Sequence, residues 1–138
     1  MSPADPAQVR DPLIRATAIG LGAGRLAIGA GIWLAPSLAG RALGFGSLDP
    51  PALALGRLAA SRDLVLGGWQ LASLGKRSSL HRSSLALALV DAGDALSFAA
   101  LILGQRDPLR SAALRGLAAS LPAALAGAWL SRRLARRT

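Results

Sequence analysis

Four apolar stretches, each near 20 residues long, constrain the fold of this chain more than any other feature. They cover about residues 13–34, 52–75, 85–104 and 111–130. A helix of about 20 residues is long enough to cross the hydrocarbon core of a bilayer. The chain lacks glutamate, has a single lysine and has a mean hydropathy of +0.43, so it carries too little polar material to coat a soluble bundle. We expect an all-α, four-helix transmembrane bundle that forms a single domain over residues 1–138.

Turn signals separate the predicted spans. Ala35-Pro36 and Asp49-Pro50-Pro51 bound the first connection, and Gln105–Pro108 fills the third. Proline interrupts a helix because it has no backbone N–H to donate. The second connection, Lys76–Ser84, is basic and rich in serine, and we expect a tight cytoplasmic loop there.

Small residues recur at four-residue spacing inside the first and last spans: Ala16, Gly20 and Gly24, and then Ala119, Ala123 and Gly127. In lipid, such a stripe lets helix backbones approach closely. The same spacing also arises by chance in a chain this rich in alanine and glycine. Close packing and chance therefore both stay open.

The distribution of basic residues predicts the orientation of the spans. Nine lie in the N-terminal flank, the second connection and the tail: Arg10, Arg15, Lys76, Arg77, Arg82, Arg132, Arg133, Arg136 and Arg137. Four lie on the other side: Arg41, Arg106, Arg110 and Arg115. Because basic loops are retained in the cytoplasm, we expect a multi-pass plasma-membrane protein with N-terminus and C-terminus cytoplasmic. The basic tail would also attract anionic lipid headgroups.

Six ionisable residues lie inside the predicted spans and form a candidate intramembrane polar network: Arg25, Arg57, Arg62, Asp63, Asp91 and Asp94. Each Arg or Asp at the centre of a membrane helix costs about 2.5–3.5 kcal/mol, so these groups need partners. Their charges sum to zero, which predicts ion pairs between the first three spans, although the individual pairs stay open. Arg62 and Asp63 point about 100° apart on a helix, so we expect different partners for them. Arg57, near the outer end, has the alternative of snorkelling to the interface.

This network has two interpretations. In the first, the pairs are structural and specify the order and register of the helices. In the second, the charges line a polar cavity for a substrate or a proton. A cavity with unpaired carboxylates at its wall would favour the second interpretation, and closed pairs would favour the first.

Other motifs assign no catalytic, cofactor-binding or metal-binding residue. The glycine-rich segments in the first span do not complete a phosphate-binding pattern, and Asp91-Ala-Gly-Asp94 alone is weak evidence for a metal site. His81 is the only histidine, and we expect it to be a solvated loop residue. The scarcity of aromatic residues, 4% of the chain, argues against a nucleic-acid partner. Cysteine is absent, so thiol chemistry is excluded.

The chain resembles small bacterial four-helix membrane proteins of unknown function, loosely similar to the DoxX-like proteins. The residues that carry this resemblance are Gly24-Arg25-Leu26, the stretch 59–67 with Arg62-Asp63, and Asp91-Ala-Gly-Asp94. The resemblance implies an integral membrane protein with polar residues in its first three helices and no defined activity. Some DoxX-like proteins are linked to quinone oxidoreductases, but no motif here carries that role over.

We therefore expect an accessory subunit or a small binding or transport protein, with a membrane-protein partner or a homo-oligomer as possible assemblies. One alternative is an enzyme or enzyme subunit that acts on a lipid or quinone in the membrane. A second is a soluble bundle rich in alanine and leucine, which would be extracted without detergent.

Overall fold

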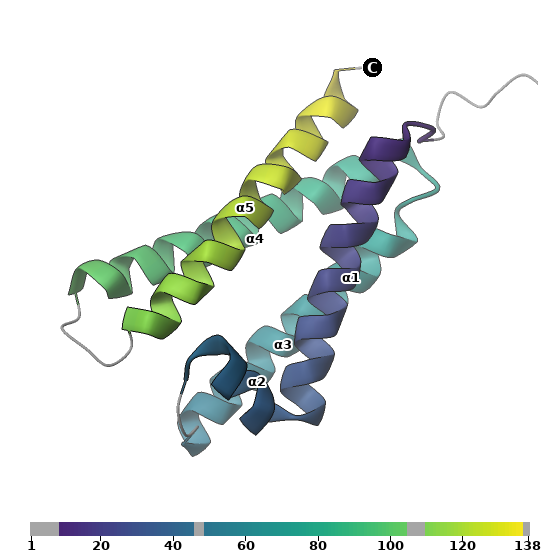
Figure 1. The fold of residues 1–138 in the computed structure, drawn as a ribbon. Coiled ribbons are helices and arrows are strands. Elements are labelled where there is room, and N and C mark those ends of the chain that lie inside the picture. The colour runs from purple at the N-terminus through teal and green to yellow at the C-terminus, as the bar shows by residue number, and fades with distance from the viewer. Residues whose placement is uncertain (1–8, 46–48, 105–109, 137–138) are drawn as a thin grey trace, which may run out of the picture.

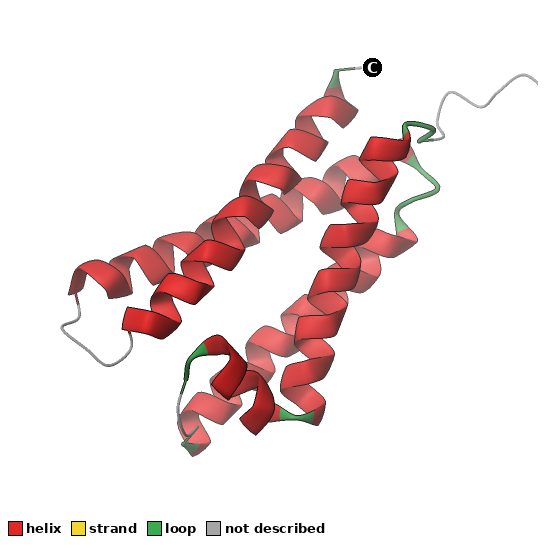
Figure 2. Cartoon of the chain, viewed as in Figure 1, coloured by secondary structure: helices red, strands yellow, loops and turns green. Residues whose placement is uncertain are grey.

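The computed structural model describes residues 9–45, 49–104 and 110–136, which form helices and no strand. Figures 1 and 2 show the five helices of these residues: α1 (Pro12–Leu34), α2 (Pro36–Leu43), α3 (Pro50–Ala72), α4 (Arg77–Gly104) and α5 (Arg110–Ala135). The all-α prediction is confirmed. The four long helices correspond to the four predicted spans, and α2 is an additional short helix.

Aspartate followed by proline starts two of the long helices. The Asp11 carboxylate accepts hydrogen bonds from the backbone N–H groups of Leu13 and Ile14, and Pro12 is the first residue of α1. Asp49 in the same way accepts from the N–H of Ala52 at the start of α3. These caps satisfy N–H groups that have no partner within the helix. At its other end α1 stops at Leu34, immediately before the predicted break.

The connections differ from the prediction in two places. The first contains α2, which ends at Gly44 in a left-handed conformation with φ of 88°. The predicted loop Lys76–Ser84 is wrong, because α4 already begins at Arg77. Two of its serines, Ser83 and Ser84, are buried, whereas Ser78 is exposed. The predicted third connection lies mainly at 105–109, outside the described residues.

The long helices are arranged as two pairs, α1 with α3 and α4 with α5. Glycine allows the first pair to pack closely. A Cβ atom added at Gly67 of α3 would lie 2.7 Å from the carbonyl oxygen of Gly22 in α1, and one at Gly29 would lie 2.8 Å from the carbonyl oxygen of Ala60. The backbones thus approach to a distance that only glycine permits.

The predicted stripe of α1 is not the face that packs on α3. A Cβ atom at Gly20 or Gly24 would meet no other heavy atom within 4 Å. The sequence left open whether this stripe packs on another helix, and small residues occur on both faces of α1. On α5, by contrast, Gly127 does lie close to Ala88 of α4, at 3.1 Å from the Ala88 side chain to the added Cβ.

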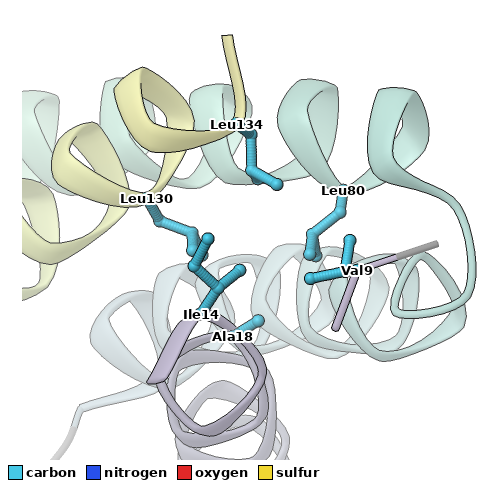
Figure 3. Packing of buried hydrophobic residues seen from close by; sticks show 6 residues of the cluster. All are labelled: Val9, Ile14, Ala18, Leu80, Leu130 and Leu134. Atoms are coloured by element: carbon cyan, nitrogen blue, oxygen red, sulfur yellow. The ribbon is translucent and has the colours of Figure 1, made fainter. Parts of the chain in front are cut away.

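The two pairs are joined at one end and diverge towards the other (Figure 1). The joined end holds a cluster of buried apolar residues from the chain before α1 and from α1, α4 and α5: Val9, Ile14, Ala18, Leu80, Leu130 and Leu134 (Figure 3). At the same end, Arg77 donates hydrogen bonds to the carbonyl oxygens of Arg133 and Leu134. It thereby satisfies groups that the C-terminus of α5 leaves without intrahelical partners.

Three of the described helices, α1, α4 and α5, are long and apolar enough to cross a membrane. Large apolar side chains also cover the outer surface of the described residues. On α3 these include Leu55, Leu58 and Val65, which are 68–70% exposed. A surface with so many exposed large apolar residues is unusual for a soluble monomer.

We predict that Gly67→Ala destabilises the protein, by about 1–3 kcal/mol, because the new methyl group overlaps the Gly22 carbonyl. The neighbouring Gly68→Ala is the matched control, since its methyl group meets open space. That control should gain about 0.8–1 kcal/mol from helix propensity. Thermal unfolding in detergent measures both, and equal midpoints for the two variants would contradict the close packing of α1 on α3.

Candidate functional site

The guanidinium of Arg25 lies at the centre of a buried group of charges. Arg25 is 7% exposed and extends from α1 towards both α3 and α4. Its Nη1 donates to Oδ1 of Asp63 on α3 at 2.5 Å, and its Nη2 donates to Oδ1 of Asp91 on α4. One arginine therefore links three helices and connects the two helix pairs.

A second arginine continues the network towards the surface. Arg62 on α3 binds the Asp94 carboxylate through two hydrogen bonds, Nη1 to Oδ1 at 3.0 Å and Nη2 to Oδ2 at 2.8 Å. This fork geometry is the strongest arrangement for an arginine and a carboxylate. Asp91 and Asp94 are three residues apart, so they project from the same face of α4. The Arg62 side chain is 37% exposed, against 8% for Arg25.

Arg62 and Asp63 contact each other, although adjacent positions on a helix predicted different partners for them. Oδ1 of Asp63 also accepts from Nε of Arg62 at 3.4 Å and from its Nη2 at 3.3 Å. The long arginine side chain folds back along α3 and overcomes the difference of about 100° between adjacent residues. Asp63 thus lies between the two guanidinium groups and joins both ion pairs into one network.

Arg57 does not join this network, which corrects the predicted set of six. Its guanidinium lies over the ring of Trp33, 5.3 Å from the ring centroid, in a cation–π contact. The indole N–H of Trp33 donates to Ser61 on α3 at 3.3 Å. Arg57 is an exposed residue of α3, and its snorkelling to a membrane interface stays a prediction.

Without Arg57 the charges of the network no longer balance. Two guanidinium groups face three carboxylates, so one negative charge remains. Oδ2 of Asp91 is buried and has no hydrogen-bond partner among the described residues. The network is therefore closed at Arg62 and Asp94 but incomplete at Asp91.

A cavity of about 530 Å³ adjoins the network between the two helix pairs. Four of its polar lining residues are Arg62, Asp63, Asp91 and Asp94, and Arg25 also lies at its wall. The remaining wall is mainly apolar and includes Ile28, Ile32, Leu43, Phe45, Leu55 and Phe98. The cavity reaches the molecular surface, since Ile28 and Leu55 are 47% and 68% exposed.

Small residues and α2 shape this cavity. Four members of the two stripes line it: Gly20, Gly24, Ala119 and Ala123. A Cβ atom at either glycine would meet no neighbouring atom within 4 Å. Pro36, Gly40 and Leu43 of α2 complete the wall. Arg115 of α5 donates to the carbonyl oxygen of Ala42 at 2.9 Å, which holds the end of α2 against α5.

A second buried polar group was missed by the sequence reasoning. Gln70 is fully buried on α3 and donates to Ser84 at 3.1 Å, while Ser83 donates to the Gln70 side chain at 2.6 Å. His81 is also part of α4, with Nδ1 at 3.1 Å from both the hydroxyl and the carbonyl oxygen of Ser131. The sequence signal that could have revealed the buried group around Gln70 is the presence of this polar residue in an otherwise apolar stretch.

The charges of the network lie both between helices and at the wall of the cavity. The buried pairs hold helices together, and the same carboxylates border an apolar cavity. In the described residues, no group of three or more His, Cys, Asp or Glu side chains is placed to hold a metal ion. Acidic and basic groups that accept and donate hydrogen bonds are the chemistry available at this site.

We predict that Arg25→Gln lowers the free energy of unfolding by about 3–5 kcal/mol, because it leaves buried Asp91 without its cation and Asp63 with only the longer contacts to Arg62. The matched control, Arg57→Gln, removes the same charge from the exposed Trp33 contact and should cost no more than about 1 kcal/mol. Accumulation in membranes and thermal unfolding in detergent measure both effects. If the two variants lose equal stability, Arg25 does not hold the helix pairs together.

Comparison of the chain with protein-family models, curated proteins and solved structures finds no match. The side chains of the network and the cavity beside them are therefore the observations from which a function is inferred.

Proposed function

We propose that this chain is a four-span integral membrane protein that binds a small amphipathic molecule in the cavity between its helix pairs. The observation that carries the proposal is the cavity itself, in which apolar walls end at a cluster of carboxylates and guanidinium groups. Its volume of about 530 Å³ lies within the range of about 300–1,000 Å³ that is typical of small-molecule sites.

The position of its charges supports α3 as a fourth membrane span. Arg62 and Asp63 lower the average hydropathy of α3, but both take part in the internal network. Leu58 and Val65 of α3, which do not line the cavity, are 68% and 70% exposed. A helix whose charges are paired inside the protein presents an apolar surface to lipid, and this relieves the cost of insertion.

The ends of the bundle support the orientation with both termini in the cytoplasm. The start of α1, the junction of α3 and α4, and the end of α5 lie at the joined end of the molecule (Figure 1). The described basic residues of that end include Arg10, Lys76 and Arg132. We propose that it faces the cytoplasm of a plasma membrane and that the tail contacts anionic headgroups.

Trp33 and Trp129 are suitably placed for the two interfaces. Trp33 lies near the end of α1 beneath Arg57, and Trp129 lies near the end of α5 with Arg133 5.7 Å from its ring centroid. Tryptophan favours the headgroup region, and each adjacent arginine reaches towards water or phosphate.

Binding or transport fits the site better than a purely structural network. A structural network needs closed pairs only, whereas one oxygen of Asp91 is left without a partner beside a cavity. For the alternative, an enzyme acting on a lipid or quinone, the described residues of this site offer no supporting group beyond the same arginines and aspartates. The accessory-subunit role and a protein partner or homo-oligomer remain proposals that are compatible with the same cavity.

We predict opposite labelling of two single cysteines, a test that is simple because the chain has no native cysteine. Ser78→Cys, exposed at the start of α4, should be protected from an impermeant thiol reagent in intact cells. Ser111→Cys, exposed at the start of α5, should react. Permeabilised cells, in which both must react, provide the control; labelling of both positions in intact cells would contradict the four-span topology.

We predict that Gly24→Leu lowers the affinity for amphiphiles that occupy the cavity, because the leucine would fill space at the cavity wall. Gly31→Leu is the matched control: it lies on the same helix, also meets open space, and is not among the cavity-lining residues. Native mass spectrometry of protein in nanodiscs, with dodecanol, dodecylamine and dodecanoic acid as probes, measures the bound fraction. Binding of none of the three, or equal loss in both variants, would overturn the proposed function.

A further inference from the structure

The charge imbalance of the network indicates which amphiphiles the cavity selects. Two arginines meet three aspartates, and the arginine nearest in sequence, Arg57, is engaged with Trp33 instead. Among the described residues that line the cavity, the basic side chains are Arg25 and Arg62, and both already bind carboxylates. With all three carboxylates ionised, the described residues at the polar end of the cavity carry one surplus negative charge.

Asp91 identifies where that charge is available. Its side chain is 9% exposed, its Oδ1 accepts from Arg25, and its Oδ2 has no partner in the described part of the chain. Asp91 also lines the cavity. The terminal torsion of an aspartate is soft, so we expect the Asp91 carboxylate to rotate and present Oδ2 to a ligand in the cavity.

The surroundings of Asp91 make an unsatisfied acceptor costly. A buried acceptor without a hydrogen bond costs about 1–3 kcal/mol, and more when it is charged. Water compensates such a group poorly at membrane depth, where the surrounding medium is hydrocarbon. A ligand that brings both a positive charge and an N–H donor would satisfy the oxygen and the charge imbalance together.

We propose that the cavity prefers a hydrophobic amine, with its ammonium group at Asp91 and Asp94 and its hydrocarbon part against the apolar wall. This inference rests on the proposed function and specifies its ligand class. Asp94, with a side chain 31% exposed, lies three residues from Asp91 on the same face of α4 and would attract the same cation. The apolar wall, which includes Ile28, Ile32 and Phe98, excludes a fully hydrophilic cation.

The headgroup preference of the unaltered protein is the first test. Dodecylamine, dodecanol, dodecanoic acid and dodecyltrimethylammonium share one alkyl chain and are compared at equal mole fraction in nanodiscs. We expect dodecylamine to bind at least about tenfold more tightly than dodecanol, as expected for a hydrogen bond to a charged group. The acid should bind least, and the quaternary ion should bind less tightly than the amine because it has no N–H to donate.

Asp91→Asn tests the assigned residue. Asparagine keeps an acceptor for Arg25 and removes the surplus charge, so the preference for dodecylamine over dodecanol should fall by about tenfold. Asp11→Asn makes the same chemical change at the cap of α1, away from the cavity, and should leave the preference unchanged. Equal effects of both variants would show that Asp91 does not select the ligand.

The outcomes separate this inference from the proposed function. If all four probes fail to bind, the cavity is not a binding site and both proposals are overturned. If dodecanol and dodecylamine bind equally well and Gly24→Leu still abolishes binding, the proposed function stands. In that case the amine preference is wrong, and a proton already neutralises the surplus charge. Equal binding of the quaternary ion and the primary amine would overturn the hydrogen bond to Asp91.

Discussion

The bridge from Arg25 to Asp63 and Asp91 is the interaction on which the rest of this structure depends. It joins the α1–α3 pair to α4 through buried charged groups, which are costly to leave without a partner. Away from this bridge and the apolar cluster around Leu80 and Leu130, the two helix pairs diverge. In lipid, apolar contact adds little drive for helix association, so paired charges and close packing of small residues take that role.

Divergence of the helix pairs explains why a cavity exists beside buried charges. Close approach at Gly22 and Gly67 holds α1 on α3, while Gly20 and Gly24 on the same helix have no neighbouring side chain to meet. Their exposed backbone therefore becomes cavity wall. Gly20 and Gly24 of α1 line the same cavity as Asp91 and Asp94 of α4. One apolar cavity therefore has acidic groups in its wall. On this combination rests our proposal that a hydrophobic cation binds there.

Much of the fold was predictable, because its signals are local. Asp11-Pro12 and Asp49-Pro50 start helices, and the break after Leu34 follows from Pro36. The helix α2 and the early start of α4 were not predictable in this way. Arg77 and the following serines look like a loop in sequence. They are helical because Gln70 and the carbonyl oxygens at the end of α5 satisfy their polar groups, and these partners lie far away along the chain.

The residue pattern by itself determined that the chain is helical, that its charges lie within apolar segments, and that arginine must meet aspartate there. Local periodicity and the cost of burying charge are sufficient for those conclusions. The tertiary structure alone decided which residues pair. It turned Arg57 outward onto Trp33, bent Arg62 back to Asp63, and left Asp91 with an unpartnered oxygen. Counting arginines and aspartates in a sequence does not show in which direction each side chain points. That direction depends on how the neighbouring helices pack.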